Sequence, residues 1–237
     1  MNNIYYGVNP VFESLKNDRV DKLFIADDFN NQKIIELAKK KNVVTEIITK
    51  KLFISKFGNN SQGCAVKVKD FKLYSLDEII KNSKNNKNSI IVILDELSDP
   101  HNLGAILRSS DVFAVDAVVY KKHNSVSLNE TVAKTSAGAI NYVKCCEVAN
   151  LSQTIKTLKE KGYWVIGLAG EAKSDLNTIP KDVPLAIVVG SEGYGISQLV
   201  RKNCDLLAKI PMQGHVSCLN ASVSCAIVLY HLRKLVI

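Results

Sequence analysis

The chain of 237 residues lacks the marks of a membrane or secreted protein. No run approaches the roughly 20 apolar residues that a membrane-spanning helix needs. The polar start MNNIYYGVNP has no charged and then apolar layout of a signal peptide. With 46% hydrophobic and 23% charged residues, the composition is that of a globular protein with a sizeable core. We expect one large domain or two smaller ones, no membrane partner, and a location in the cytoplasm.

Metal and disulfide patterns are also missing. The six cysteines form no CxxC pair, and no His stands at zinc-ligand spacing from them. Several lie inside apolar runs, where a thiol packs as a small hydrophobic group. We therefore expect reduced core cysteines and no bound metal, and only Cys218 has a position that suits a function.

Two common nucleotide-binding patterns are absent. The chain has neither the dinucleotide pattern GxGxxG nor a phosphate loop ending in GKS or GKT. These absences argue against a Rossmann dehydrogenase and against a nucleotidase.

The net charge of +8 is concentrated in the first third of the chain, where Lys and Arg outnumber Asp and Glu most clearly. A basic surface there would suit a phosphate-backbone partner. Solvated faces rich in Lys and Asn are common in proteins without such a partner. Charge alone therefore leaves both interpretations open.

The stretch DEIIKNSKNNKNS, residues 77–89, separates two parts of the chain. It is rich in Asn, Lys and Ser and could not bury enough apolar surface to fold alone. We predict a small α/β domain over residues 1–75, a linker over 76–88 and a larger domain over 89–237.

Apolar patterns predict alternating strands and helices in both parts. In the first part we expect strands at 20–27, 43–48 and 64–71 and an amphipathic helix at 31–42. In the second part we expect strands at 89–97, 116–120, 163–170 and 184–193 and helices at 102–113 and 151–162. Uninterrupted Ile, Val and Leu runs are typical of parallel strands covered on both faces. Ligands should then bind at the carboxyl ends of these strands.

The string NLGAILRSS at 102–110 follows the first of these strands. Asp99 and Pro100 end the strand, Asn102 can cap a helix, and Gly104 permits close backbone approach. Arg108 follows Asn102 by about 1.7 helical turns, which places it near the same mouth. An ordinary capped helix with a surface Arg explains the string equally well.

The string VVGSEGYGIS at 188–197 is a buried strand followed by a glycine-rich turn. Three glycines within six residues permit close backbone approach to a ligand, and Glu192 adds one carboxylate. The alternative role of Glu192 is simple support of a helix dipole.

The string IPMQGHVSCLNASVS at 210–224 leaves a strand, turns, and enters a long apolar helix. Asn220 and Ser222 at its start are typical helix caps. The IPM segment at 210–212 offers consecutive backbone N–H and C=O groups, which suit the edge of an adenine.

In this order and spacing the three strings resemble the motifs of the SpoU-type ribose 2'-O-methyltransferases. The family's Asn with Arg six positions on, its GxEG, and its IPM followed by SLNxS are met across residues 102–222. The segments YYGVNPVFESLK and NSQGCAVKV resemble the N-terminal substrate-binding domain of the branch that methylates guanosine in 23S rRNA. Two positions depart from the pattern: Ser61 stands where His is usual, and Cys218 where Ser is usual, although the neighbouring Ser217 could substitute.

The resemblance implies a fold and partners. The fold is a SPOUT-type α/β trefoil-knot methyltransferase domain with a parallel sheet, preceded by a small α/β substrate-binding domain. The cofactor is S-adenosyl-L-methionine, and the protein is a homodimer in which the helix at 219–237 can form part of the interface. The RNA partner is 23S rRNA, with a tRNA guanosine as the second choice. A non-catalytic RNA-binding protein of ribosome assembly is the alternative class.

The resemblance also implies roles for particular residues. Arg108 helps to remove the ribose proton with an RNA phosphate, or it anchors the alkoxide and phosphate electrostatically. Asn102 orients Arg108 or the ribose, Glu192 holds the Arg or a substrate hydroxyl, and the predicted catalytic set is Arg108, Asn102, Glu192, Asn220 and Ser222. The predicted cofactor-binding set is Gly190, Ser191, Gly193, Ile210, Met212 and Leu219.

Overall fold

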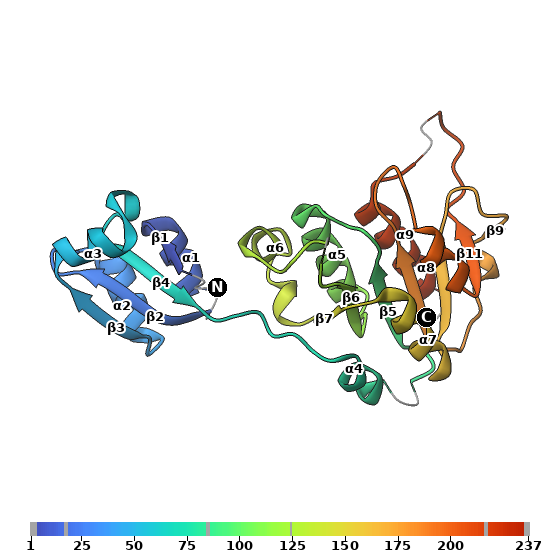
Figure 1. The fold of residues 1–237 in the computed structure, drawn as a ribbon, viewed down its shortest axis with the longest axis horizontal. Coiled ribbons are helices and arrows are strands. Elements are labelled where there is room, and N and C mark those ends of the chain that lie inside the picture. The colour runs from blue at the N-terminus through green and yellow to red at the C-terminus, as the bar shows by residue number, and fades with distance from the viewer. Residues whose placement is uncertain (1–3, 17–18, 84–85, 124, 216–217, 235–237) are drawn as a thin grey trace. The chain divides into compact units, whose positions relative to one another are not determined.

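The computed structural model describes residues 4–16, 19–83, 86–123, 125–215 and 218–234. It divides the chain into two compact units, Met1–Phe71 and Lys72–Ile237 (Figure 1). Within the described ranges, no helix has the length and apolar character needed to cross a membrane.

The N-terminal unit is a mixed sheet with helices on both faces. Its strands lie in the order β1-β4-β2-β3, with β2 and β3 parallel and β4 antiparallel to both of its neighbours. Side chains alternate between the faces of a strand. Leu23 and Ile25 therefore share a core with α1 and α2, whereas Phe24 packs with Phe53 of α3 on the other face. The elements are β1 (Ile4–Tyr6), α1 (Val8–Lys16), β2 (Val20–Ala26), α2 (Gln32–Lys40), β3 (Val44–Ile48), α3 (Lys50–Phe57), η1 (Asn59–Ser61) and β4 (Cys64–Val68).

The C-terminal unit is built on a parallel sheet. Its described strands lie in the order β7-β6-β5-β10-β8-β11-β9, and every described pair is parallel. All five residues of β5 and of β10 are buried, as expected for strands covered on both faces. The strands are β5 (Ile90–Leu94), β6 (Ala117–Lys121), β7 (Lys144–Val148), β8 (Trp164–Leu168), β9 (Ser174–Asp175), β10 (Leu185–Val189) and β11 (Leu206–Lys209).

Helices cover this sheet on its two faces (Figure 1). Leu151, Ile155 and Leu158 of α7 join one core cluster with β5 and β10, and Val200 of α8 joins the same cluster. Helices α5 and α9 pack against each other, and α6 packs against α5. The helices are α4 (Leu76–Asn82), α5 (Pro100–Val112), α6 (Glu130–Thr135), η2 (Ala139–Asn141), α7 (Leu151–Glu160), η3 (Leu176–Thr178), α8 (Gln198–Asn203) and α9 (Ala221–Lys234).

The stretch expected to be a linker differs from that expectation. Residues 76–82 form helix α4, which begins with a capping box between Ser75 and Glu78. Ile79 of this helix is fully buried in the core of the C-terminal unit. The segment need not fold alone, because Ile79 is buried against apolar side chains of the sheet. The composition of the segment by itself does not reveal this contact.

The expected helix cap at Asn102 is also wrong. The N-cap of α5 is Asp99, whose Oδ1 accepts a hydrogen bond of 2.9 Å from the backbone N–H of His101. Pro100 follows at the first helical position, where its missing N–H costs nothing. Asn102 therefore lies inside the first turn, and its side chain is available for other contacts.

All six cysteines are free, and four of them are buried: Cys64, Cys145, Cys146 and Cys225. Burial raises the pKa of the Cys64 thiol to about 11 and that of Cys225 to about 12. Cys218 is the exposed one, so it differs from the core cysteines as the sequence suggested.

Candidate active site

A closed turn follows strand β10 and forms the centre of the site. Ser191 and Gly195 exchange two backbone hydrogen bonds of 3.1 and 2.9 Å. Gly193 and Gly195 have φ angles of +86° and +66°, which favour glycine. A Cβ atom on Gly190 would lie 2.1 Å from the carbonyl carbon of Gly195. These glycines are thus required for closure of the turn itself, a role that the sequence pattern did not distinguish from close approach to a ligand.

A buried carboxylate holds the far end of this turn. Asp95, only 3% exposed at the end of β5, accepts a hydrogen bond of 2.7 Å from the backbone N–H of Ser197. The backbone N–H of Asp95 donates to the carbonyl of Val189 at 2.9 Å. The turn is therefore fixed at both of its ends to the sheet.

Three predicted residues from three distant segments meet at this turn. The Asn102 amide donates to Oε1 of Glu192 at 2.9 Å. The Asn220 amide donates to Oδ1 of Asn102, also at 2.9 Å, and to the same Oε1 of Glu192. We call Asn102, Glu192 and Asn220 the amide–carboxylate cluster. Both amides donate to Oε1 of Glu192, and no described residue donates a hydrogen bond to the other oxygen of this carboxylate.

Asn220 also caps helix α9. Its Oδ1 accepts hydrogen bonds from the backbone N–H of Ser222 at 2.9 Å and of Val223 at 3.3 Å. The Ser222 hydroxyl donates to the same oxygen at 2.6 Å. The capping role and the site role proposed from the sequence are therefore compatible, because each uses a different end of one side-chain amide. Ser222 reaches the cluster only through Asn220.

Arg108 stands apart from the cluster. Its side chain is exposed on α5 and makes no hydrogen bond or ion pair with the described residues. Six helical positions correspond to about 600° of rotation and roughly 9 Å along the axis. Arg108 and Asn102 therefore emerge on different sides of α5, and the expected contacts of Arg108 with Asn102 or Glu192 are not formed within one chain. A spacing in helical turns gives the distance along the axis, whereas the side of the helix depends on the rotation.

Gly104, in the same motif, lies under helix α6. A Cβ atom there would be 2.6 Å from Cβ of Thr135. This glycine lets α5 and α6 pack closely, so it supports the site indirectly.

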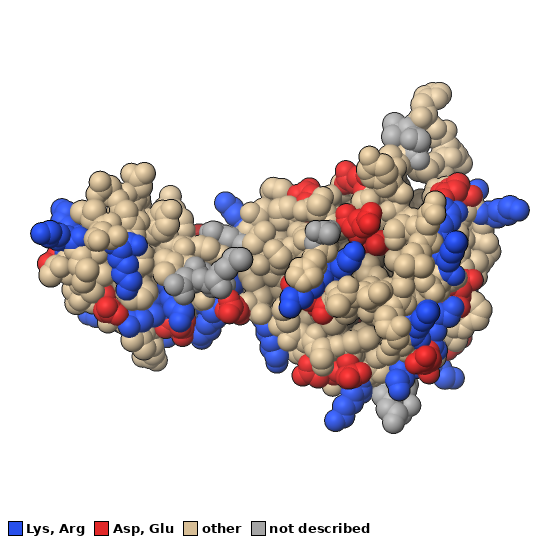
Figure 2. Space-filling view, in the orientation of Figure 1, with Lys and Arg blue, Asp and Glu red and all other residues tan. Residues whose placement is uncertain are grey.

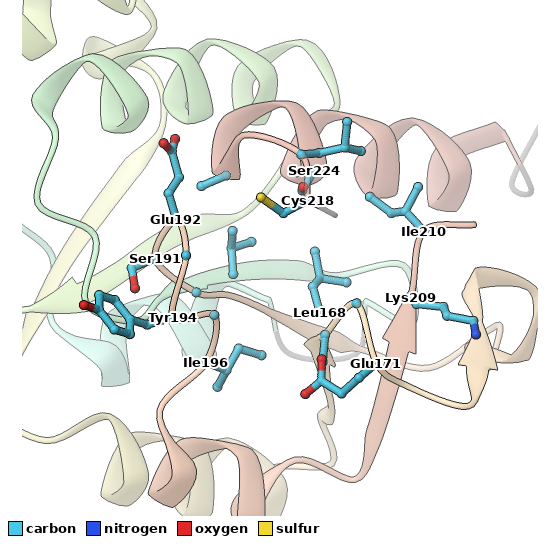
Figure 3. Close-up of a pocket in the computed structure, with 18 of the residues that line it drawn as sticks. Leu168, Glu171, Ser191, Glu192, Tyr194, Ile196, Lys209, Ile210, Cys218 and Ser224 are labelled. Carbon is cyan, nitrogen blue, oxygen red and sulfur yellow. The ribbon is translucent and has the colours of Figure 1, made fainter. Parts of the chain in front are cut away.

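A cavity of about 480 Å³ lies beside the cluster (Figure 3). Five segments line it: the end of β8, the turn after β10, α8, the end of β11 with the segment after it, and the start of α9. All of the predicted cofactor-binding residues are among its lining residues, namely Gly190, Ser191, Gly193, Ile210, Met212 and Leu219. Cys218 lines it too, whereas Ser217 lies outside the described residues.

One wall of this cavity consists of residues that were not predicted from the sequence. Leu168 and Glu171, at the end of β8, line the cavity, as does Arg201 of α8. The Arg201 guanidinium donates to the Glu171 carboxylate. A hydrogen bond from its own backbone and the one from Arg201 lower the pKa of Glu171. The available signal was the string GLAGEAK directly after a predicted strand, because parallel strands direct their carboxyl-end loops to one edge.

The lining suits S-adenosylmethionine. Leu168, Ile196 and Ile210 provide apolar walls, and the carboxylates of Glu171 and Glu192 make the lining polar at two places. The volume falls in the range of small-molecule sites, which are mostly apolar with a few placed polar groups. Within the described residues, no group of three or more His, Cys, Asp or Glu side chains could hold a metal ion.

Comparisons with known proteins agree with this geometry. A model of the SpoU rRNA Methylase family matches residues 89–230, and a model for RNA 2'-O ribose methyltransferase substrate binding matches residues 4–74. The chain belongs to the SpoU methylase family. YacO of Bacillus subtilis (strain 168), whose name places it among TrmH family tRNA/rRNA methyltransferases, is 38% identical over 233 residues, which cover 96% of this chain and 94% of YacO. A TrmH family relative from Staphylococcus haemolyticus is 41% identical over 219 residues, 91% of this chain and 88% of that protein.

Solved structures share the fold. The SpoU methyltransferase AviRb from Streptomyces viridochromogenes, solved with AdoMet, has a TM-score of 0.72 at 19% identity and covers 98% of this chain and 89% of its own. An AdoMet-bound rRNA methyltransferase from Sinorhizobium meliloti has a TM-score of 0.69 at 17% identity, covering 100% and 88%. The predicted SPOUT-type α/β fold and the family are confirmed, and these two solved structures contain the cofactor that the sequence predicts. The chain is thus an RNA methyltransferase of the SpoU family.

Proposed function

We propose that this enzyme transfers a methyl group from S-adenosylmethionine to the ribose 2'-O of a guanosine in 23S rRNA, in the cytoplasm. The observation that carries the proposal is the amide–carboxylate cluster, which lies beside a cavity lined by every residue predicted to bind the cofactor. The N-terminal strings that resemble the 23S rRNA branch support the choice of RNA. A tRNA guanosine is the alternative, since the names of the relatives include both RNA classes.

The ribose hydroxyl needs a fixed approach, because it is a poor nucleophile. Bound S-adenosylmethionine supplies an electrophilic methyl group. Glu192 has one oxygen held by two amides, so its other oxygen is free to accept a hydrogen bond from the ribose hydroxyl. Asn102 and Asn220 position that carboxylate, and Ser222 fixes Asn220. In this role Glu192 binds the substrate hydroxyl and not the side chain of Arg108.

Arg108 then acts as an electrostatic anchor for an RNA phosphate and for the developing alkoxide. An exposed guanidinium with no partner among the described residues can bind a phosphate through two parallel hydrogen bonds. The same position of Arg108 also suits the alternative role, in which Arg108 helps an RNA phosphate to remove the proton of the ribose hydroxyl.

We also propose a homodimer. Val223, Ile227 and Tyr230 form an exposed apolar stripe on α9, since their spacing places them on one helix face. The stripe continues to α5, because the Tyr230 ring lies edge-on to Phe113 at 6.3 Å and Val112 beside it is 70% exposed. Arg108 precedes Val112 by four positions and so shares its helix face. A second copy that covers the stripe would lie next to Arg108.

The N-terminal unit is proposed to bind the RNA substrate. Lys and Arg side chains are spread over its visible face (Figure 2). Lys56 lies over the rings of Phe24 and Phe57, and Lys22 also lies over Phe24. Phe24 is itself buried, so the cationic side chains are the groups on this surface that suit the phosphates of RNA.

The deciding experiment maps 2'-O-methyl marks in 23S rRNA and tRNA from cells with the gene, without it, and with the Arg108→Ala variant. We expect one guanosine mark of 23S rRNA to disappear in the second and third strains. Loss of a tRNA mark would move the target to tRNA, and loss of no mark would contradict the proposed reaction. Titration with S-adenosylmethionine separates an inactive RNA-binding protein from an enzyme with an unsampled target.

A further inference from the structure

Tyr194 is the most exposed large hydrophobic side chain among the described residues, at 92%. It stands between Gly193 and Gly195 in the turn after β10 and has no ring contact with the described residues. Figure 3 shows its ring directed away from the cavity, whereas Glu192 leaves the same turn in another direction. An aromatic ring in this position has most of its surface available to a ligand.

The turn presents this ring on a fixed backbone. Ser191 and Gly195 close the turn by two hydrogen bonds, and Ser197 is tied to the buried Asp95. A side chain on such a support loses little freedom when it binds, which favours recognition. Exposure here therefore differs from that of an aromatic residue on a loose loop.

The backbone of Tyr194 lies close to that of Glu192 in the proposed reaction centre. Two residues of extended chain span at most about 7 Å, so Tyr194 is within that backbone distance of Glu192. Glu192 is the residue proposed to hold the ribose hydroxyl, and each ribose carries its base through a single bond. A base of the bound strand is therefore within reach of the ring.

Other exposed aromatic side chains of this unit lie elsewhere. Trp164 is the first residue of β8, at the opposite end of the strand from the cavity. Tyr230 belongs to the apolar stripe of α9, and Tyr142 follows η2. Of these four residues only Tyr194 is among those that line the cavity.

We propose that Tyr194 is a base-stacking residue that holds a nucleobase of an unpaired target RNA strand at the mouth of the active site. The inference rests on the proposed function and adds the part of the RNA that the turn recognises. Proteins that bind single-stranded RNA commonly stack bases on Tyr, Phe or Trp, and the interaction accepts any base because each has a π face.

The first test compares Tyr194→Ala, Tyr194→Leu and Tyr194→Phe in the full chain, with an unmodified 23S rRNA transcript and saturating S-adenosylmethionine. Removal of one stacking ring weakens binding by about five- to 150-fold. We expect KM for RNA to rise in that range for Ala and Leu and to stay within about threefold for Phe, with cofactor affinity unchanged. Equal behaviour of Leu and Phe, or no effect of Ala, would overturn the proposal.

The second test does not depend on methyl transfer. In the Trp164→Phe/Tyr194→Trp variant, binding of a 12-nucleotide oligouridylate should quench the indole emission, because a stacked base quenches indole fluorescence. The Trp164→Phe single variant measures the background. If the wild type methylates neither 23S rRNA nor tRNA but quenching occurs, the proposed target fails and the stacking role stands. Absence of quenching at a saturating oligonucleotide concentration refutes stacking.

One competing occupant of the ring is a second copy of the chain. Sedimentation of the wild type and Tyr194→Ala at equal concentration separates the two cases. A dimer that dissociates only in the variant would show that the ring packs against protein, and would overturn the proposal. An unchanged oligomeric state together with the loss of RNA binding supports it.

Discussion

Replacing Asn102 by Asp tests the amide–carboxylate cluster with a change of almost no volume. The Asn102 amide donates to Oε1 of Glu192 at 2.9 Å, and Asn102 is only 8% exposed. Asn102→Asp turns this donor into a second carboxylate at the same distance. Two carboxylates so close cannot both stay ionised at low cost.

The size of the effect follows from the separation. Two unit charges about 3 Å apart repel by roughly 1.4 kcal/mol in water and about 6 kcal/mol at an effective dielectric near 20. Glu192 is exposed, so solvent lowers the upper figure. Protonating one carboxyl at pH 7 costs about 4 kcal/mol from a usual pKa near 3.9 and therefore limits the penalty. We expect a destabilisation of about 2 to 4 kcal/mol at pH 7.

The sign of the pH dependence is fixed by the shared proton. In the folded Asn102→Asp variant, repulsion between the new carboxyl and Glu192 raises the pKa of one of the two above its value in the unfolded chain. The protonated pair is therefore fully favourable below about pH 4, and its stability is lost as the pH rises through the raised pKa. The gap in melting temperature between variant and wild type should be widest near pH 7 and narrow toward pH 4.5.

Melting curves at both pH values measure this gap. A unit of this size shifts by about 2 to 4 °C per kcal/mol, so we expect a loss of roughly 5 to 15 °C at pH 7. Asn150→Asp is the matched control, because Asn150 caps α7 by accepting a hydrogen bond from Gln153 and Asp caps equally well. In Asn102→Asp/Glu192→Gln the new amide can donate to the new carboxylate, so stability should return. Equal losses in Asn102→Asp and the control, or a gap independent of pH, would refute the geometry of the cluster.

Four further outcomes follow from the structure. Arg108→Ala should abolish methyl transfer without changing cofactor affinity in a calorimetric titration, and single-turnover rates within about tenfold of wild type would remove Arg108 from the mechanism. Gly190→Ala should destroy cofactor binding, since its Cβ would lie 2.1 Å from backbone of Gly195, and calorimetry measures this directly. Cys218→Ser should be close to neutral in parallel transfer assays, and a clear gain would show that the family hydroxyl matters. Deletion of residues 1–71 should leave cofactor binding intact and remove most RNA affinity at a given salt concentration, as filter binding would show.

The residues of the site could be named from the sequence, because Gly, Asn and Glu stand in three strings that each follow a buried strand and together resemble one family. Their contacts could not be read in the same way. Asn102 bonds to Glu192 across 90 positions and to Asn220 across 118. Local spacing placed Arg108 near the same mouth as Asn102, and the family resemblance suggested Arg108 or the ribose as the partner of Asn102, but the two side chains emerge on different sides of α5. A short-range sequence pattern identifies a candidate site residue, whereas the order of the strands in the sheet determines which distant residue lies within hydrogen-bond distance of it.

The sheet order also accounts for the residues that were missed. Strand β10 lies between β5 and β8, and all three are parallel, so their carboxyl-end loops must meet at one edge. The loop after β5 supplies Asp95, and the loop after β8 supplies Leu168 and Glu171. None of these residues has an unusual type or spacing, so no motif marks them. They contribute because they neighbour the turn after β10. A substitution at Asp95 should therefore shift Glu192 and Tyr194 together, because Asp95 anchors the backbone of their turn at Ser197 and contacts neither side chain.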